Sequence, residues 1–137
     1  MGQNSETYYS SPVQIPGTTW KSISRGLSYG FTATKTDGTL WSWGKNEYGQ
    51  MGQNNTAQKS SPTQIGTDTT WDIAGGDNGT GIATKTDGTL WAFGYNMQGQ
   101  LGQGSPPAGL PSHTKISSPV QIPGTTWSRP VQMGTNA

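Results

Sequence analysis

The sequence contains no cysteine and a single histidine, and only 11% of its 137 residues are charged. The absence of cysteine excludes disulfide bonds and thiolate chemistry. The net charge is +1 at pH 7, which argues against a nucleic-acid partner, because a phosphate backbone attracts clustered lysine and arginine. No apolar run approaches the ~20 residues that a membrane helix needs, so we expect no membrane insertion.

Aliphatic residues are scarce as well, and all hydrophobic residues together make up 28% of the chain. The six tryptophans and five tyrosines compensate, since one aromatic side chain buries roughly 150–250 Å². The 21 glycines and nine prolines suit tight turns between short strands. We therefore expect one all-β domain with a thin aromatic core.

The segment TKTDGTLW occurs twice, at residues 34–41 and 84–91, and both copies run into a glycine-rich tail. A period of about 50 residues is typical of propeller blades and related repeat arrays. The chain divides into two whole repeats and an incomplete third, with boundaries at residues 1–50, 51–100 and 101–137. An insertion at residues 106–113 lengthens the third repeat, which stops matching after Trp127.

Each repeat predicts four short strands. The segment SSPxQI alternates apolar and polar residues, as a half-buried strand does, and occurs at residues 10–15, 60–65 and 117–122. We interpret these segments as three copies of one strand. A second strand begins at Trp20 and at Trp71, and the third strand covers residues 31–35 and 82–85.

A hairpin joins the third strand to the fourth. Asp-Gly at residues 37–38 and 87–88 predicts a two-residue turn, because glycine accepts the positive φ that such a turn requires. The fourth strand is expected at residues 40–44 and 90–94. It places Trp41 and Trp43 on one face and apolar or small residues on the other, so both faces can be buried between stacked blades.

The tails WGKNEYGQMGQ and FGYNMQGQLGQG, each preceded by TDGTLW and followed by SSPxQI, resemble the regulator of chromosome condensation repeat, whose pattern is roughly WG-x-N-x-x-GQLG-x-G. The resemblance covers nearly everything from Met1 to Trp127 and implies a β-propeller with four-stranded blades. The family often has a histidine shortly before the alanine of the third strand, where this chain has Gly30 and Thr80. The nucleotide-exchange activity of the family's founder on a small GTPase is not carried over, because no residue of that surface can be matched.

Few residues suggest chemistry. His113 lies in the inserted loop between proline, serine and threonine, which favours a solvated loop residue over a catalytic base or metal ligand. Asp77 and Asn78, followed by Gly79, could help to bind a cation, although an ordinary turn is favoured. The segment from Gly99 to Gly104 lacks the Lys-Ser/Thr of a phosphate loop. We expect no enzyme activity, no cofactor and no metal.

Tyr48 and Tyr95 recur at nearby positions in the loops after the fourth strand and are the better candidates for contact with a partner. The favoured function is a non-catalytic structural or protein-interaction module. The alternative is a propeller that binds a ligand or glycan, as a lectin-like or host-recognition module would. Binding of sugars that is lost when both tyrosines are replaced by alanine would favour the alternative.

Two blades alone would leave both outer faces bare, and repeat units generally need about three neighbours to bury a continuous core. The first SSPVQI strand would complete a blade begun elsewhere, and the C-terminal segment would supply a strand to another. Copies related head to tail close into a ring when the rotation permits. We therefore expect a cyclic homo-oligomer, and we favour a trimer over other numbers of copies. The rival interpretation is a piece of a longer propeller.

Overall fold

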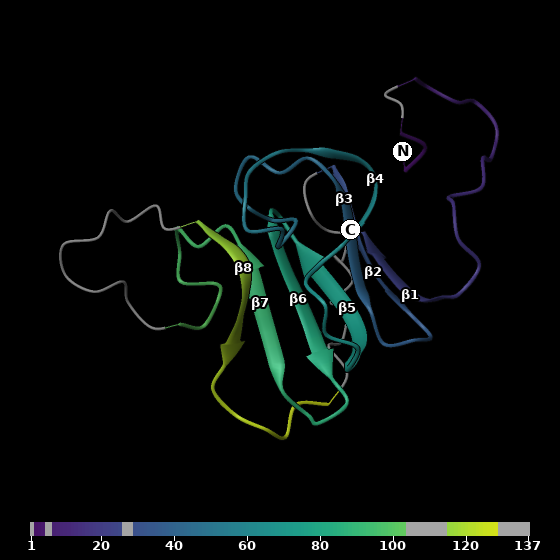
Figure 1. Cartoon of the computed structure of the whole chain (residues 1–137). Helices are drawn as coiled ribbons and strands as arrows, with labels where there is room; N and C mark the ends of the chain where they lie inside the picture. The colour runs from purple at the N-terminus through teal and green to yellow at the C-terminus, as the bar shows by residue number, and fades with distance from the viewer. Residues whose placement is uncertain (1, 5–6, 26–28, 104–114, 129–137) are drawn as a thin grey trace, which may run out of the picture.

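The computed structural model describes residues 2–4, 7–25, 29–103 and 115–128. Eight strands account for the regular structure of these residues (Figure 1). They are β1 (Trp20–Arg25), β2 (Gly30–Lys35), β3 (Leu40–Gly44), β4 (Lys59–Gln64), β5 (Trp71–Asp77), β6 (Thr80–Lys85), β7 (Leu90–Gly94) and β8 (Ile116–Ile122). No helix is present in the described part of the chain, and hence none that could cross a membrane.

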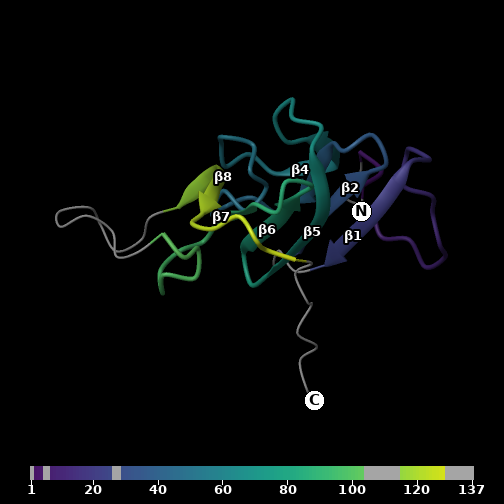
Figure 2. The same ribbon diagram turned by 90° about the horizontal axis from the view of Figure 1, so that it is seen from below.

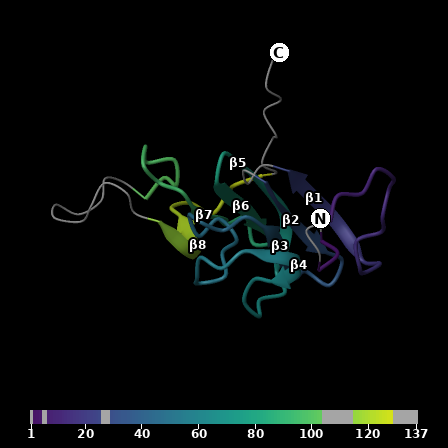
Figure 3. The same ribbon diagram turned by 90° about the horizontal axis from the view of Figure 1, so that it is seen from above.

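The strands form two four-stranded antiparallel sheets in which chain neighbours pair, in the orders β1-β2-β3-β4 and β5-β6-β7-β8. The expected four-stranded units are thus confirmed. The two sheets lie side by side, with the N-terminal segment beside β1 and with β8 at the opposite side of the molecule (Figures 2 and 3). In each sheet the Asp-Gly turn lies at one end, which we call the turn end. The connections after the first and third strands of the sheet lie at the other end, which we call the loop end.

The Asp-Gly turns differ from the expected geometry. The amide of Gly38 donates to the carbonyl of Lys35 at 3.0 Å, and the amide of Lys35 donates to the carbonyl of Thr39 at 3.0 Å. The loop therefore contains three residues instead of two, with Gly38 at φ +79°. This is a type I turn followed by a left-handed residue, the usual solution for a three-residue hairpin. Asp37 fixes the turn by accepting from the amide and hydroxyl of Thr39.

One predicted strand is absent. Residues 60–64 belong to β4 and residues 117–122 belong to β8, but residues 10–15 form no strand. The reason is a missing partner, because β4 pairs with β3 and β8 pairs with β7, whereas no strand precedes residues 10–15 in the described part of the chain. A sheet is therefore built from the last three strands of one repeat and the first strand of the next.

The core lies between the sheets. In each sheet we distinguish a tryptophan face, which carries Trp43 or Phe93, and a leucine face, which carries Leu40 or Leu90. Directly paired residues of neighbouring strands point to the same face. The leucine face of the first sheet packs against the tryptophan face of the second, in a buried cluster of Leu40, Ile65, Trp71, Ala74, Ala83 and Phe93. The predicted burial of both faces of the fourth strand is confirmed, because residues of both faces are buried in β3 (Leu40 and Trp43) and in β7 (Ala92 and Phe93).

A polar seam joins β1 and β2 to β5 beside this core. The hydroxyl of Thr34 donates to the carbonyl of Asp72 at 3.0 Å and contacts the hydroxyl of Ser22 at 2.6 Å. The ammonium of Lys21 forms an ion pair with the carboxylate of Asp72. At the turn end, the amide of Trp71 donates to the carbonyl of Gly38 at 2.9 Å. These bonds fix the position of one sheet on the other.

Candidate functional site

The two tyrosines singled out in the sequence meet at the loop end. Tyr48 follows β3 and Tyr95 follows β7, so they belong to different sheets, yet their ring centroids lie 5.1 Å apart in an edge-on arrangement. Both residues are half-buried. Such a pair contributes about 0.5–1.5 kcal/mol beyond the area it buries. The junction of the two sheets therefore ends in an aromatic pair that is still open to solvent.

The turn that carries Asp77 and Asn78 lies against this pair. A Cβ atom on Gly79 would lie 3.5 Å from Tyr95 Cβ and 3.7 Å from Tyr48 Cδ2. Asp77 accepts a hydrogen bond from the amide of Asn78 at 2.8 Å, and both residues are exposed. No set of acidic or histidine side chains in the described residues could hold a metal ion. Asp77 and Asn78 thus form the rim of the aromatic pair.

Charged and apolar residues extend the site along the loop end. Lys115 places its ammonium 5.4 Å from the Tyr48 ring and donates to the carbonyl of Glu47 at 2.9 Å. The Glu47 carboxylate lies 3.0 Å from the ammonium of Lys45 and raises the pKa of that lysine. Met97 is exposed and accepts a hydrogen bond from the hydroxyl of Tyr95.

Tyr29 also belongs to the loop end, and sequence reasoning missed it. Its side chain is 81% exposed, and the ammonium of Lys45 lies 5.9 Å from its ring. Its φ is +73°, an unusual value for a bulky residue, and the second repeat has Gly79 at the corresponding place. The only signal in the sequence was this replacement of glycine by tyrosine. We use the term loop-end surface for Tyr29, Lys45, Glu47, Tyr48, Asp77, Asn78, Tyr95, Met97 and Lys115.

A buried amide shapes the loop that presents Tyr48. The side chain of Asn46 is fully buried. Its amide nitrogen donates to the carbonyls of Asn55 and Ala57, both at 2.9 Å, and its oxygen accepts from the amide of Met51 at 2.9 Å. The loop is therefore held from inside, and Tyr48 is presented from a fixed backbone. His113, the remaining candidate, lies outside the described residues.

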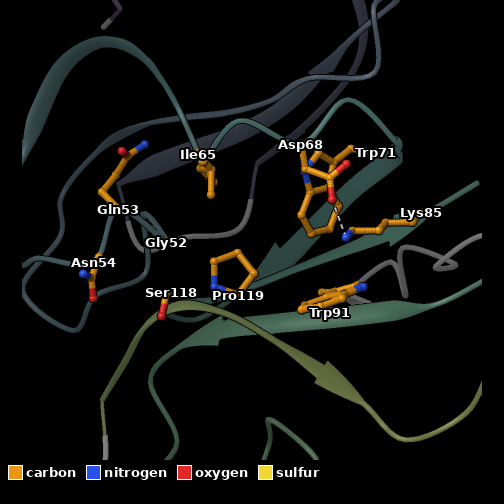
Figure 4. Close-up of a pocket in the computed structure, with 11 residues that line it drawn as sticks. Gly52, Gln53, Asn54, Ile65, Asp68, Trp71, Lys85, Trp91, Ser118 and Pro119 are labelled. Carbon is orange, nitrogen blue, oxygen red and sulfur yellow. Dashed lines mark hydrogen bonds and ion pairs between the residues drawn. The ribbon is translucent and has the colours of Figure 1, made fainter.

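A hollow of about 500 Å³ lies between the sheets and was not expected from the sequence (Figure 4). Its walls include Trp71, Trp91, Asp68, Lys85 and Gln53. The ammonium of Lys85 lies 4.8 Å from the ring of Trp71 and 4.2 Å from that of Trp91, and Asp68 pairs with it. Figure 4 shows this ion pair beside the two indoles.

The charges of this hollow neutralise each other. The hydrogen bond from Lys85, followed by that from Thr70, lowers the pKa of Asp68 to about 2. Lys35 lies in the same way between Trp20 and Trp41 in the first sheet, at 4.9 and 3.8 Å from their rings. Because the arrangement repeats, the lysine between two tryptophans stabilises each sheet, and the indoles serve the core as the sequence predicted.

Comparison with known families gives one match. The Regulator of chromosome condensation (RCC1) repeat matches residues 37–82 and residues 87–135. These two ranges cover more than half of the chain. No curated protein matches the sequence.

Three similar solved structures show the fold. The structure of human WBSCR16 is 20% identical and has a TM-score of 0.63 over 86% of this chain and 29% of its own. Prp20p from Saccharomyces cerevisiae, in a study of its binding to Gsp1p and histones, is 18% identical, with a TM-score of 0.64 over 82% and 28%. Yeast RCC1 (Prp20) bound to Kap60 is 20% identical, with a TM-score of 0.66 over 90% and 32%. The chain therefore spans about a third of these proteins or less, and its two sheets are blades of a β-propeller.

Proposed function

The chain belongs to the regulator of chromosome condensation repeat family, and on that basis we propose that it is a non-catalytic propeller module that binds other proteins through its loop-end surface and completes its ring with further copies of itself. The aromatic pair at the junction of the two blades is the observation that carries the first part. Tyrosine and methionine are enriched where proteins bind one another, and loops on a rigid scaffold commonly carry binding residues.

The properties of the surface suit a protein partner. Tyr29 and Met97 are exposed, and Tyr48 and Tyr95 are half-buried. On the same surface, Lys45 pairs with the carboxylate of Glu47, and Lys115 donates to the main-chain carbonyl of Glu47. An aromatic centre with a charged rim is the usual composition of a protein interface. The partner is expected to offer an apolar side chain with nearby carboxylates.

Two of the similar structures support this class of function. Prp20p binds Gsp1p and histones, and yeast RCC1 (Prp20) binds Kap60. Each of these partners is a protein. Because the identity is at most 20% and the chain spans under a third of their length, we carry over neither those partners nor an exchange activity.

The outer faces of the blade pair support self-assembly. The tryptophan face of the first blade is only partly covered. Trp43 is buried beside Gly2 of the N-terminal segment, whereas 58% of Ile23 is exposed. A hollow of about 280 Å³ on this face is lined by Trp20, Ile23 and Trp43, among others. In the second blade the corresponding face is covered by Leu40. A second copy could supply the same cover from its own leucine face, and head-to-tail contacts of this kind close a ring.

Binding of a panel of immobilised proteins and of glycans tests the first part. The double variant Tyr48→Ser/Tyr95→Ser is compared with Tyr8→Ser/Tyr9→Ser, which removes two exposed tyrosines from the N-terminal segment. We expect the first variant to lose protein binding and the second to retain it. Protein binding that survives in Tyr48→Ser/Tyr95→Ser contradicts the proposed surface, and binding of glycans alone would favour a lectin-like module.

Light scattering over a range of concentrations tests the second part. We expect the mass to exceed the 14.5 kDa of one chain and to reach a plateau at a closed ring. A well-folded monomer at micromolar concentration contradicts self-assembly and leaves the loop-end surface to its own test.

A further inference from the structure

Two stretches of the chain are identical over eleven residues. Residues 10–20 and residues 117–127 both read SSPVQIPGTTW. The second stretch supplies most of β8, which is the last strand of the second blade, and ends at Trp127. The first stretch forms no strand before Trp20, and 44% of Val13 is exposed. One sequence therefore occurs once with a strand partner and once without.

The two stretches already share local contacts. The side-chain amide of Gln3 donates to the carbonyl of Gln14, and that of Gln103 donates to the carbonyl of Gln121. A Cβ atom on Gly17 would lie 3.2 Å from Trp20 Nε1, and one on Gly124 would lie 2.8 Å from Trp127 Nε1. Residues 10–20 thus approach the shape of residues 117–127 before they gain a partner strand.

We propose that the copies assemble by strand exchange, in which residues 10–20 of one copy replace residues 117–127 beside β7 of another. This inference rests on the proposed self-assembly and identifies the segments through which two copies would contact each other. Since the residues are identical, Val13 would face Ala92 in the register that Val120 has now. The strand exchange itself neither gains nor loses a side-chain contact.

The gain comes from the blade that is attached to the exchanged strand. The amide of Trp127 donates to the carbonyl of Gly88 at 3.0 Å, as that of Trp71 donates to Gly38 at 2.9 Å. After exchange, Trp20 of the second copy would take the place of Trp127, and a whole blade begins at Trp20. That blade would cover the leucine face of the second blade, as the second blade covers the first.

The side chains at this new junction are complementary. Leu90 corresponds to Leu40 and would enter the hollow lined by Trp20, Ile23 and Trp43 of the second copy. The segment that now occupies this place continues beyond Trp127 with SRPVQM, which lacks the strand pattern that begins at Trp20 and at Trp71. Residues 10–20 of a second copy therefore suit this place better than residues 117–127, because they are followed by a complete blade.

Every blade of such a ring is complete. The first blade keeps β1–β4, and the second blade has β5–β7 with residues 10–15 of the next copy as its last strand. The tethered β8 competes with an effective concentration on the order of millimolar, so exchange depends on the blade junction that it creates.

Cysteine cross-linking tests the proposed contact, and the chain carries no cysteine that would interfere. Chains with Val13→Cys are mixed with chains with Ala92→Cys and oxidised, and the linked peptides are identified by mass spectrometry. We expect a disulfide between positions 13 and 92 of different chains. The N-terminal segment and β7 lie on opposite sides of one chain (Figure 1), so this link cannot form within a copy. Val120→Cys/Ala92→Cys is the control that links β8 to β7 in one chain.

A pair of matched substitutions gives an independent test by light scattering. Val13→Asp alters a segment without a strand partner, so we expect it to prevent association and leave the fold unchanged. Val120→Asp weakens β8 alone, and we expect it to lower the concentration of half-association by about tenfold, equivalent to about 1.4 kcal/mol. Equal effects of the two substitutions, or association that Val13→Asp leaves intact, overturn strand exchange.

The outcomes also separate this inference from the proposed function. Assembly without the 13–92 disulfide overturns strand exchange and retains self-assembly by another contact. A monomer that forms no disulfide overturns both and leaves protein binding by the loop-end surface intact.

Discussion

Replacement of Gly38 by alanine should destabilise the protein more than the same replacement at left-handed glycines without close neighbours, such as Gly66 and Gly99. A Cβ atom on Gly38 would lie 1.8 Å from the carbonyl oxygen of Thr69, which belongs to the segment between the blades. Real Cβ atoms do not approach backbone oxygen so closely, so the segment must move. That movement disturbs the bond from the Trp71 amide to the Gly38 carbonyl, which is 2.9 Å long.

The expected magnitude follows from two separable contributions. The φ of Gly38 is +79°, and a side chain in this region costs about 1–2 kcal/mol. A disturbed, partly buried hydrogen bond and a displaced backbone add about 2 kcal/mol. The sum is about 3–4 kcal/mol. With an unfolding entropy of about 2.1 cal/mol/K per residue, each kcal/mol lowers Tm by about 3–4 °C for a chain of this length.

Gly66→Ala and Gly99→Ala are the matched controls. Their φ values are +60° and +75°, and a Cβ atom added to either glycine would have no neighbour within 4 Å among the described residues. They therefore report the backbone cost alone, about 1–2 kcal/mol. Thermal unfolding followed by circular dichroism gives the comparison. A Tm for Gly38→Ala no lower than that of Gly66→Ala would refute the close approach between Gly38 and Thr69.

Two further predictions concern buried amides and acid sensitivity. Asn46→Ala leaves three loop backbone groups without partners and should lower the free energy of unfolding in urea by about 2–3 kcal/mol. Asn96 accepts one hydrogen bond, from the amide of Leu101, so Asn96→Ala should cost less. The reverse order would contradict the role of Asn46. The pKa of Asp68 is lowered from 3.8 to about 2, so its stabilisation is present above about pH 4 and is lost as pH falls towards 2. Asp68→Asn should remove this part of the dependence of stability on acid pH. It should cost no more than about 1 kcal/mol at pH 7, because the carboxylate is 38% exposed. If stability depends on pH in the same way in Asp68→Asn as in the original chain, the ion pair with Lys85 does not stabilise the fold.

The strands at the hairpins were predictable because several local signals agree there. Alternating residues on each side of Asp-Gly predict two paired strands, and β3 and β7 begin and end where expected. The turn length was not predictable from the dipeptide, since glycine at positive φ serves both two-residue and three-residue loops. The bond from Thr39 to Asp37 favours the longer loop, and it depends on a threonine that the pattern did not weigh.

The failure at residues 10–15 has a different cause. A strand needs a neighbour, and the alternation of Val13 and Ile15 contains no information about whether one is present. For the candidate site, recurrence in the loops was enough to select Tyr48 and Tyr95. The contacts of Lys35 and Lys85 with the tryptophans were not predicted. Each lysine lies between threonines in the sequence, and it meets its tryptophans only when β1 pairs with β2 and β5 pairs with β6.

The offset between repeat and blade has a consequence for how such chains can change in length. Each sheet takes its last strand from the following repeat, so duplication of one repeat of about 50 residues at any starting position inserts one closed blade and leaves no interior sheet open. Loss of one repeat is equally harmless to the interior. A change in blade number would then alter packing only where the first and last blades meet. Selection would have to adjust this contact after each duplication or loss of a repeat.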